Sequence, residues 1–284
     1  MTGSMIIYGT IGIFRKFIPL PSDALAFSRG IAGGVFLLLL MRVRGQRFAW
    51  EKTGKKNFIL LAVTGAIIGF NWILLFEAYN YTTVAVATLC YYMQPVIVLM
   101  LSPLVLKERI SGKQMFFAAL SVAGMILVSG VIGDNAGGPG NTRGILLGLG
   151  AAVLYAAVVL INKQIRGVPA YEKTVIQLIS AAAALIPYMA AHGNLRSFPM
   201  NGTETVLLLI VCLVHTGIAY ALYFGAIENL PARSCALLSY IDPVTAVLLS
   251  ALFLHEAVTV FSAAGAVLII GSAIGSELAG KKEI

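Results

Sequence analysis

Charged residues are scarce in this sequence: they make up 11% of its 284 residues, whereas 59% are hydrophobic. Soluble globular domains carry about 25% charged residues, so the scarcity argues against a water-soluble domain. Cysteine is rare too, with three residues that all fall within apolar segments and show neither metal-ligand spacing nor a disulfide framework. These absences exclude a soluble enzyme and a disulfide-stapled scaffold.

Motifs for bound cofactors are also missing. Nothing matches G-x-x-x-x-G-K-[ST], which argues against ATP-driven transport by this chain alone. No cluster of His, Cys and carboxylates indicates a metal, and no Ser/His/Asp arrangement indicates hydrolysis. We therefore expect no cofactor, no metal and no catalytic residues.

Apolar blocks of roughly twenty residues dominate the sequence instead, the length at which an α-helix crosses ~30 Å of hydrocarbon. Backbone polar groups in lipid must be satisfied internally, so the blocks should be helical, and the alternation of a membrane β-barrel is absent. The sequence predicts an all-α membrane protein with ten transmembrane helices, at about 1–18, 22–41, 57–79, 82–106, 113–132, 143–162, 173–191, 203–227, 231–254 and 258–278.

The net charge of +8 does not argue for a nucleic-acid partner, because the positive residues lie in short loops between apolar blocks. Their distribution over these loops indicates how the chain is oriented in the membrane. If the N-terminus is cytoplasmic, the inside loops hold most of the Lys and Arg residues, including the run from Arg42 to Lys56. The outside loops hold Arg15, Lys16, Arg143 and Arg196. We expect a multi-pass protein of the bacterial inner (plasma) membrane, in contact with the lipid bilayer, with both termini in the cytoplasm.

An internal repeat appears when the sequence is shifted by 148 residues. The shift superposes aromatic, proline, serine and acidic residues, namely Phe76/Phe224, Tyr92/Tyr240, Pro95/Pro243, Ser102/Ser250 and Glu108/Glu256. We predict two five-helix repeats over residues 1–132 and 143–279, a linker over 133–142 and a tail over 280–284. Because five is odd, the second repeat should be inverted, as in many secondary transporters.

Each half has an aromatic-rich helix with a proline near its middle, followed by an acidic residue at the next turn. The first runs from Leu89 through Pro95 to Glu108, and the second from Leu238 through Pro243 to Glu256. This pattern resembles the EamA-type branch of the drug/metabolite transporter superfamily. The resemblance implies a secondary transporter, not an enzyme, that moves a small metabolite by alternating access. Export of an amino acid or similar amphipathic solute is the expectation.

Ionisable residues inside membrane spans are costly, so they are candidates for function. His215, Glu77 and Asp242 are the candidates for proton coupling. The alternatives are a core histidine bonded to a backbone carbonyl and, for Glu77, a hydrated carboxylate at the interface. Asp242 precedes Pro243 as Gln94 precedes Pro95, where the family often has Glu; both either line the cavity or satisfy loosened backbone.

Tyrosines are the main candidates for contact with a solute, because they combine apolar area with a hydrogen-bonding tip. An interfacial aromatic belt is the competing interpretation. The predicted substrate-binding residues are Asn71, Trp72, Tyr92, Gln94, Tyr155, His215, Tyr240 and Asp242.

Several further residues have two interpretations each. Arg29 either binds a carboxylate bidentately or snorkels to the nearer membrane surface. Glu108 and Glu256 are expected to cap or lock helix ends. The glycine pairs Gly65/Gly69, Gly144/Gly148 and Gly271/Gly275 indicate close packing of helices, either within the chain or at the seam of a homodimer.

The alternative function is a membrane-embedded enzyme that acts on lipid-linked substrates. Such enzymes usually gather carboxylates or histidines near one interface. The acidic residues are scattered in this sequence, which favours the transporter.

Overall fold

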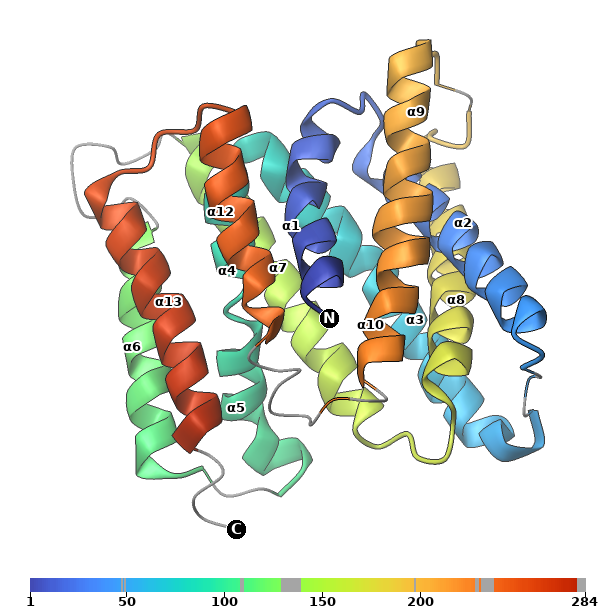
Figure 1. Cartoon of the computed structure of the whole chain (residues 1–284), viewed down its shortest axis with the longest axis horizontal. Coiled ribbons are helices and arrows are strands. Elements are labelled where there is room, and N and C mark those ends of the chain that lie inside the picture. The colour runs from blue at the N-terminus through green and yellow to red at the C-terminus, as the bar shows by residue number, and fades with distance from the viewer. Residues whose placement is uncertain are drawn as a thin grey trace.

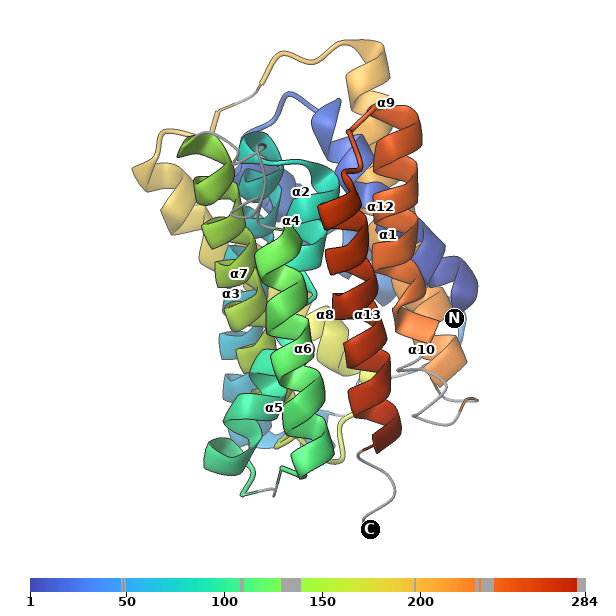
Figure 2. The same ribbon diagram turned by 90° about the vertical axis from the view of Figure 1, so that its left-hand side faces the viewer.

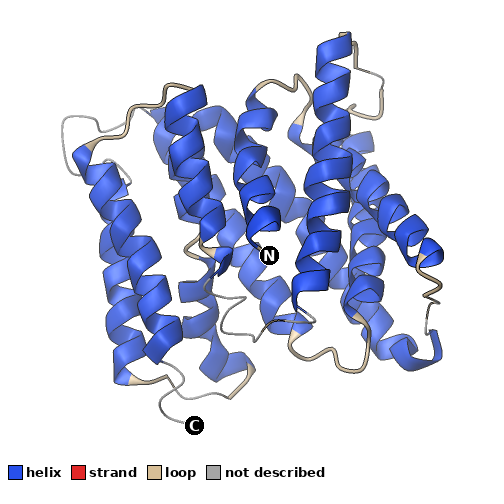
Figure 3. Ribbon diagram, in the orientation of Figure 1, coloured by secondary structure: helices blue, strands red, loops and turns tan. Residues whose placement is uncertain are grey.

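The computed structural model describes residues 1–46, 48, 50–107, 110–128, 139–196, 198–227, 230 and 238–279. Within these residues the secondary structure is helical, without strands (Figure 3). The elements are α1 (Thr2–Lys16), α2 (Ser22–Val43), α3 (Trp50–Tyr81), α4 (Val84–Tyr91), α5 (Gln94–Val105), α6 (Gly112–Val128), α7 (Pro139–Asn162), α8 (Ala170–Ala191), α9 (Gly202–Ile210), the π-helix η1 (Val211–Ile218), α10 (Ala219–Ile227), α12 (Ile241–Phe253) and α13 (Val260–Ala279).

Helical residues occupy each of the ten segments that hydropathy singles out. Six described segments are long and apolar enough to cross a membrane, and three more are shorter apolar helices over 112–128, 241–253 and 260–276. The molecule is therefore a multi-pass membrane protein. Linker residues 133–138, the tail 280–284 and Glu108 lie outside the described residues.

Two of the longest helices begin in the same way. Pro21 precedes α2 and Pro169 precedes α8, and both prolines have extended backbone with ψ near 149° and 146°. Proline is favoured beside the first helical turn because its missing N–H needs no partner there. Each helix then places an acidic side chain, Asp23 or Glu172, in its first turn, where the helix dipole favours negative charge.

Glu256 caps a helix that is distant in sequence. Its carboxylate oxygens accept hydrogen bonds from the backbone N–H groups of Val84 (2.8 Å) and Ala85 (3.3 Å) at the start of α4. Thr83 completes this N-terminus by accepting from Val86 N–H. The prediction that Glu256 caps a helix end is confirmed.

Helices α6 and α13 form a pair at one edge of the molecule, on the left in Figure 1 and towards the viewer in Figure 2. A Cβ atom added at Gly265 would lie 2.6 Å from the carbonyl oxygen of Gly124, so the two backbones touch. The Ser121 and Ser272 hydroxyls are hydrogen-bonded across the pair. Helices α2, α3 and α8 pack together at the opposite edge.

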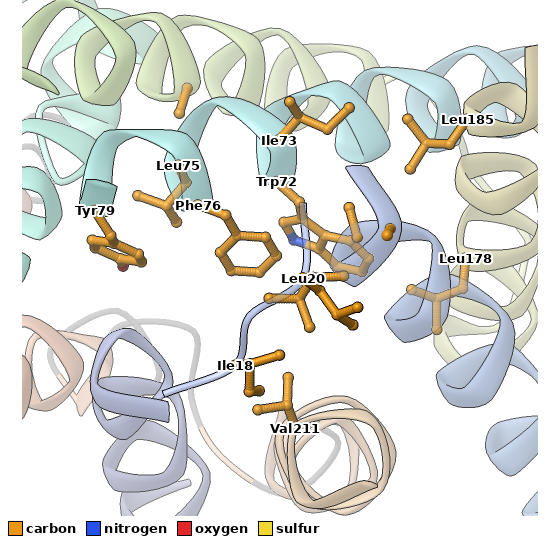
Figure 4. Packing of buried hydrophobic residues seen from close by; sticks show 14 of the residues in the cluster. Ile18, Leu20, Trp72, Ile73, Leu75, Phe76, Tyr79, Leu178, Leu185 and Val211 are labelled. Atoms are coloured by element: carbon orange, nitrogen blue, oxygen red, sulfur yellow. The ribbon is translucent and has the colours of Figure 1, made fainter. Parts of the chain in front are cut away.

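The largest core cluster joins α2, α3 and α8 with the segment between α1 and α2. Trp72 and Phe76 lie one turn apart on α3, and Figure 4 shows both rings turned towards Ile18 and Leu20. Phe76 is fully buried. This packing fixes the face of α3 that carries Trp72.

The glycine pairs serve packing within the chain. A Cβ atom at Gly65 would lie 2.4 Å from the carbonyl oxygen of Gln177 on α8, and one at Gly69 3.2 Å from that of Ala181. Gly144 and Gly148 approach Thr82 and Cys90, and Gly275 approaches Phe117; Gly271 has open space around it. Of the two interpretations, the structure favours packing between helices of one chain for all of these glycines except Gly271.

Candidate substrate site

Two helices are interrupted at matching positions. The first break lies at Tyr92 and Met93, between α4 and α5, with Pro95 near the start of α5. The second lies at Tyr240, between the helical residues 238–239 and α12, with Pro243 three residues on. Proline cannot donate a backbone hydrogen bond, so each ring frees the carbonyl four residues earlier. At the second break that carbonyl belongs to Ser239.

A hydrogen bond joins the two breaks. The Tyr92 hydroxyl donates to Asp242 Oδ2 over 2.7 Å, and the Ser239 carbonyl oxygen lies 3.4 Å from the same hydroxyl. Asp242 lies in the first turn of α12, so the contact connects α12 to α4. Asp242 is one of the side chains predicted either to line a cavity or to satisfy loosened backbone. In the structure its carboxylate accepts a hydrogen bond from the opposite half.

Tyrosine rings gather beside this contact. Tyr91 lies 6.0 Å from Tyr92 and 5.5 Å from Tyr155 of α7, measured between ring centroids. Tyr8 of α1 lies 5.7 Å from Tyr220 and 6.5 Å from Tyr223 of α10. Tyr155 also lies near Asp242 and both α10 tyrosines, so the two groups of rings are neighbours. They form a cluster built by helices of both halves.

His215 lies in the π-helix η1 and is 2% exposed. Its Nε2 is 2.7 Å from the Thr10 hydroxyl, which also donates to the Ile7 carbonyl oxygen over 2.7 Å. Nδ1 lies 3.4 Å from the Ile210 carbonyl oxygen, and the Phe14 ring packs edge-on at 4.9 Å. π-Helical turns occur frequently at functional sites.

Arg29 does not reach the membrane surface, because its side chain is 4% exposed and lies inside the bundle. Its guanidinium carbon sits 4.2 Å from the Trp72 ring centroid and 5.3 Å from that of Phe76. Nε donates to the Thr216 hydroxyl of η1 over 3.0 Å. The snorkelling interpretation of Arg29 is therefore wrong.

A sequence profile described as the EamA-like transporter family matches residues 1–130 and again residues 142–277. The chain belongs to the EamA-like transporter family. The uncharacterized transporter YxxF of Bacillus subtilis (strain 168) is 28% identical to it, over 95% of this chain and 85% of the relative. Protein RarD of Salmonella typhi is 26% identical, over 86% of this chain and 81% of the relative.

A solved crystal structure shares the fold of this EamA-like transporter, with a TM-score of 0.68 and 20% sequence identity. The match covers 98% of this chain and 95% of the other. The family membership and the relatives' names identify a membrane transporter, as the paired proline motifs predict.

The remaining candidate residues of this EamA-like transporter lie at different distances from the cluster. Asn71 is buried and donates from Nδ2 to the Ala151 carbonyl oxygen of α7, while its Oδ1 has no hydrogen-bond partner among the described residues. Gln94 and Tyr240 are half-buried at the two breaks. Glu77 is separate: it accepts hydrogen bonds from Ser22 (2.8 Å) and Asn80 (3.1 Å) at the end of α3.

Sequence reasoning missed three residues beside the candidates: Tyr8 in the tyrosine cluster, Thr10 next to His215, and Thr216 next to Arg29. A one-residue adjustment of the repeat, to a shift of 147, pairs Tyr8 with Tyr155, which is the signal that could have added Tyr8. Nothing in the sequence indicates the π-helical turn that brings Thr216 to Arg29.

Proposed function

We propose that this protein is a secondary transporter of the plasma membrane that moves a small amphipathic metabolite by alternating access. Two inverted halves, residues 1–132 and 143–279, would rock about the tyrosine cluster at their interface. The separate matches of the family profile to residues 1–130 and 142–277 support this division.

The pairing of helices also supports the inverted repeat. Two pairs join an element to its own counterpart, α2 with α8 and α6 with α13, and α4 contacts α12, which is the counterpart of α5. Other pairs exchange with each other when the halves are exchanged, such as α3–α7 with α1–α10, and α3–α8 with α2–η1. A two-fold axis that relates the halves would produce this set of contacts.

The hydrogen bond between Tyr92 and Asp242 is the observation that carries the proposal. It ties one broken helix to the other, and broken helices near the membrane centre are where transporters with inverted repeats hold their solutes. Polar groups at such a break can exchange a protein partner for a solute. A rearrangement at this contact would couple solute binding to the relative position of the halves.

Tyr155 supplies surface that a solute could touch. It is flanked by Tyr91 and lies near residues of α10 and α12, yet 36% of its surface is exposed. We propose the predicted residues Asn71, Trp72, Tyr92, Gln94, Tyr155, His215, Tyr240 and Asp242 as the substrate site, extended by Tyr8 and Tyr91.

Reconstitution tests the function. Purified protein in proteoliposomes should carry members of an added metabolite mixture into the vesicles faster than protein-free liposomes do, as measured by mass spectrometry of the vesicle contents. The Tyr92→Phe variant should slow the flux of the same compounds. Conversion of a lipid-linked substrate into a new species, without accumulation of an unchanged solute, would favour the membrane enzyme instead.

Coupling is proposed to use a proton, through His215, Asp242 or Glu77, or else transport is passive. Dissipating the pH gradient across the vesicles should slow coupled flux. If His215→Gln, Asp242→Asn and Glu77→Gln all keep wild-type flux and gradient dependence is absent, facilitated diffusion or coupling to another ion replaces proton coupling.

Export is proposed as the direction, and higher retention of the solute in cells that lack the protein would support it.

A further inference from the structure

The buried faces of α2 and α8 follow one register. Nearly every buried position of α2 recurs in α8 148 residues later, including Gly30/Leu178, Gly33/Ala181, Gly34/Ala182, Leu37/Leu185 and Met41/Met189. The same register places Arg29 opposite Gln177. Both are buried polar residues, 4% and 6% exposed, on faces through which α2 and α8 pack against each other.

Gln177 is fully satisfied at its terminal nitrogen. Nε2 donates to the Thr64 hydroxyl of α3 (2.8 Å) and to Asn162 Oδ1 of α7 (2.9 Å). An amide nitrogen has two hydrogens to donate, and both are used. At this position of the fold, a neutral side chain meets the structural need.

Arg29 is positively charged, whereas Gln177 at the matching position is neutral. A guanidinium carries five N–H donors. In the part of the chain that the structure describes, its hydrogen bonding consists of the one from Nε to Thr216, and no carboxylate lies within ion-pair distance. Its other contacts are the faces of Trp72 and Phe76.

Arg15 shows what a structural arginine looks like in the same protein. It is also buried, and its Nε has no partner among the described residues, but its terminal nitrogens donate to the Ile18 carbonyl oxygen (3.0 Å) and to the Ser22 hydroxyl (3.3 Å), which in turn donates to the Glu77 carboxylate (2.8 Å). Burying an arginine without a counter-charge is expensive in a membrane, and intramembrane charges therefore mark ligand pathways. Arg29 has the environment of a binding residue.

We propose that Arg29 binds the carboxylate of the transported solute; this rests on the proposed transport function. The planar guanidinium offers paired N–H donors that match a carboxylate. A single buried positive charge neutralises a monoanion, whereas a phosphate dianion would leave net negative charge inside the bundle. The buried Tyr8 hydroxyl has no hydrogen-bond partner among the described residues, so its proton is available for a bond to a bound solute.

Trp72 provides a direct readout, because it contacts Arg29 and the sequence contains two tryptophans. The Trp50→Phe variant leaves Trp72 as the sole tryptophan. The fluorescence of Trp72 is recorded while standard L-amino acids or aliphatic and aromatic monocarboxylates are added, limited to compounds that do not absorb at the excitation wavelength. The primary amide of each acid is titrated in parallel. At least one carboxylate should change the fluorescence, and its amide should bind about 10- to 100-fold more weakly.

Arg29→Gln, in the same background, copies the residue that the other half uses at this position, so it should fold. It should abolish the preference for carboxylate over amide, and Arg29→Lys should restore part of it, since charge is kept but the planar fork is lost. Arg15→Gln is the matched control and should leave the preference intact. Thermal unfolding without ligand identifies any variant that is simply unstable.

Three results would overturn the assignment: equal binding of acid and amide, a preference that survives Arg29→Gln, or no response to any carboxylate. Flux in proteoliposomes separates this failure from failure of the proposed function. Transport of uncharged solutes that Arg29→Gln leaves unchanged would refute the carboxylate site alone. Carboxylates that bind at Arg29 and never cross the bilayer would refute the transport function alone.

Discussion

Removing the Glu256 carboxylate should loosen the start of α4, which lies 172 residues away in sequence. The carboxylate accepts two backbone N–H bonds at a helix N-terminus and is half-buried. Losing an N-cap acceptor costs about 1 kcal/mol, and a charge at the helix dipole adds about 0.5 to 1 kcal/mol. We therefore expect Glu256→Ala to cost roughly 2 kcal/mol and Glu256→Gln, which keeps one acceptor oxygen, roughly 1 kcal/mol.

Glu204 is the matched control, because it also accepts a backbone N–H (2.8 Å, from Asn201) but caps its own exposed helix. Thermal unfolding in detergent should show Glu256→Ala about 4 to 8 °C below wild type and Glu204→Ala at most about 3 °C below. Hydrogen exchange measures the local effect: a loss of roughly 2 kcal/mol of local stability corresponds to roughly 30-fold faster exchange at the backbone amides of Val84 and Ala85. Unchanged exchange at these two amides in Glu256→Ala would refute the capping argument.

Three other expectations can be measured directly. Tyr92→Phe and Asp242→Asn should each slow transport, and the double variant should be no slower than the worse single one, because both remove the same hydrogen bond; additive losses would argue against it. Gly65→Ala should lower thermal stability by roughly 1 to 3 kcal/mol through a clash with α8, whereas Gly271→Ala, with open space around it, should raise stability by up to about 1 kcal/mol. A cysteine placed at Lys52 in a cysteine-free background should resist an impermeant thiol reagent in intact cells, and labelling there would reverse the proposed orientation.

Much of the helical framework could be predicted because membrane helices are long and uniformly apolar. Block length predicted segments that are helical in the structure, six of them long and apolar enough to cross a membrane. The prolines at 95 and 243 predicted both breaks, because a proline ring lacks the N–H that continues a helix. A capping role for Glu256 could be predicted because carboxylates are favoured at helix N-termini, but the sequence does not show that the capped helix is α4.

The direction of a side chain could not be predicted in the same way. Arg29 lies seven residues into α2, where a guanidinium could point to the membrane surface or into the bundle. The choice depends on the partners on α3 and η1, and these are fixed by packing rather than by local sequence. The register that pairs Arg29 with Gln177 was present in the sequence, but only burial shows that the pair shares a face.

The close pairing of α6 and α13 has a consequence for biogenesis. α6 leaves the ribosome well before α13, the helix that covers Gly124 and bonds Ser121. Until α13 is synthesised, the small, polar face of α6 faces lipid or a temporary partner such as an insertion chaperone. A nascent chain arrested before residue 260 should therefore crosslink through position 121 to the insertion machinery, and release of the complete chain should end that contact.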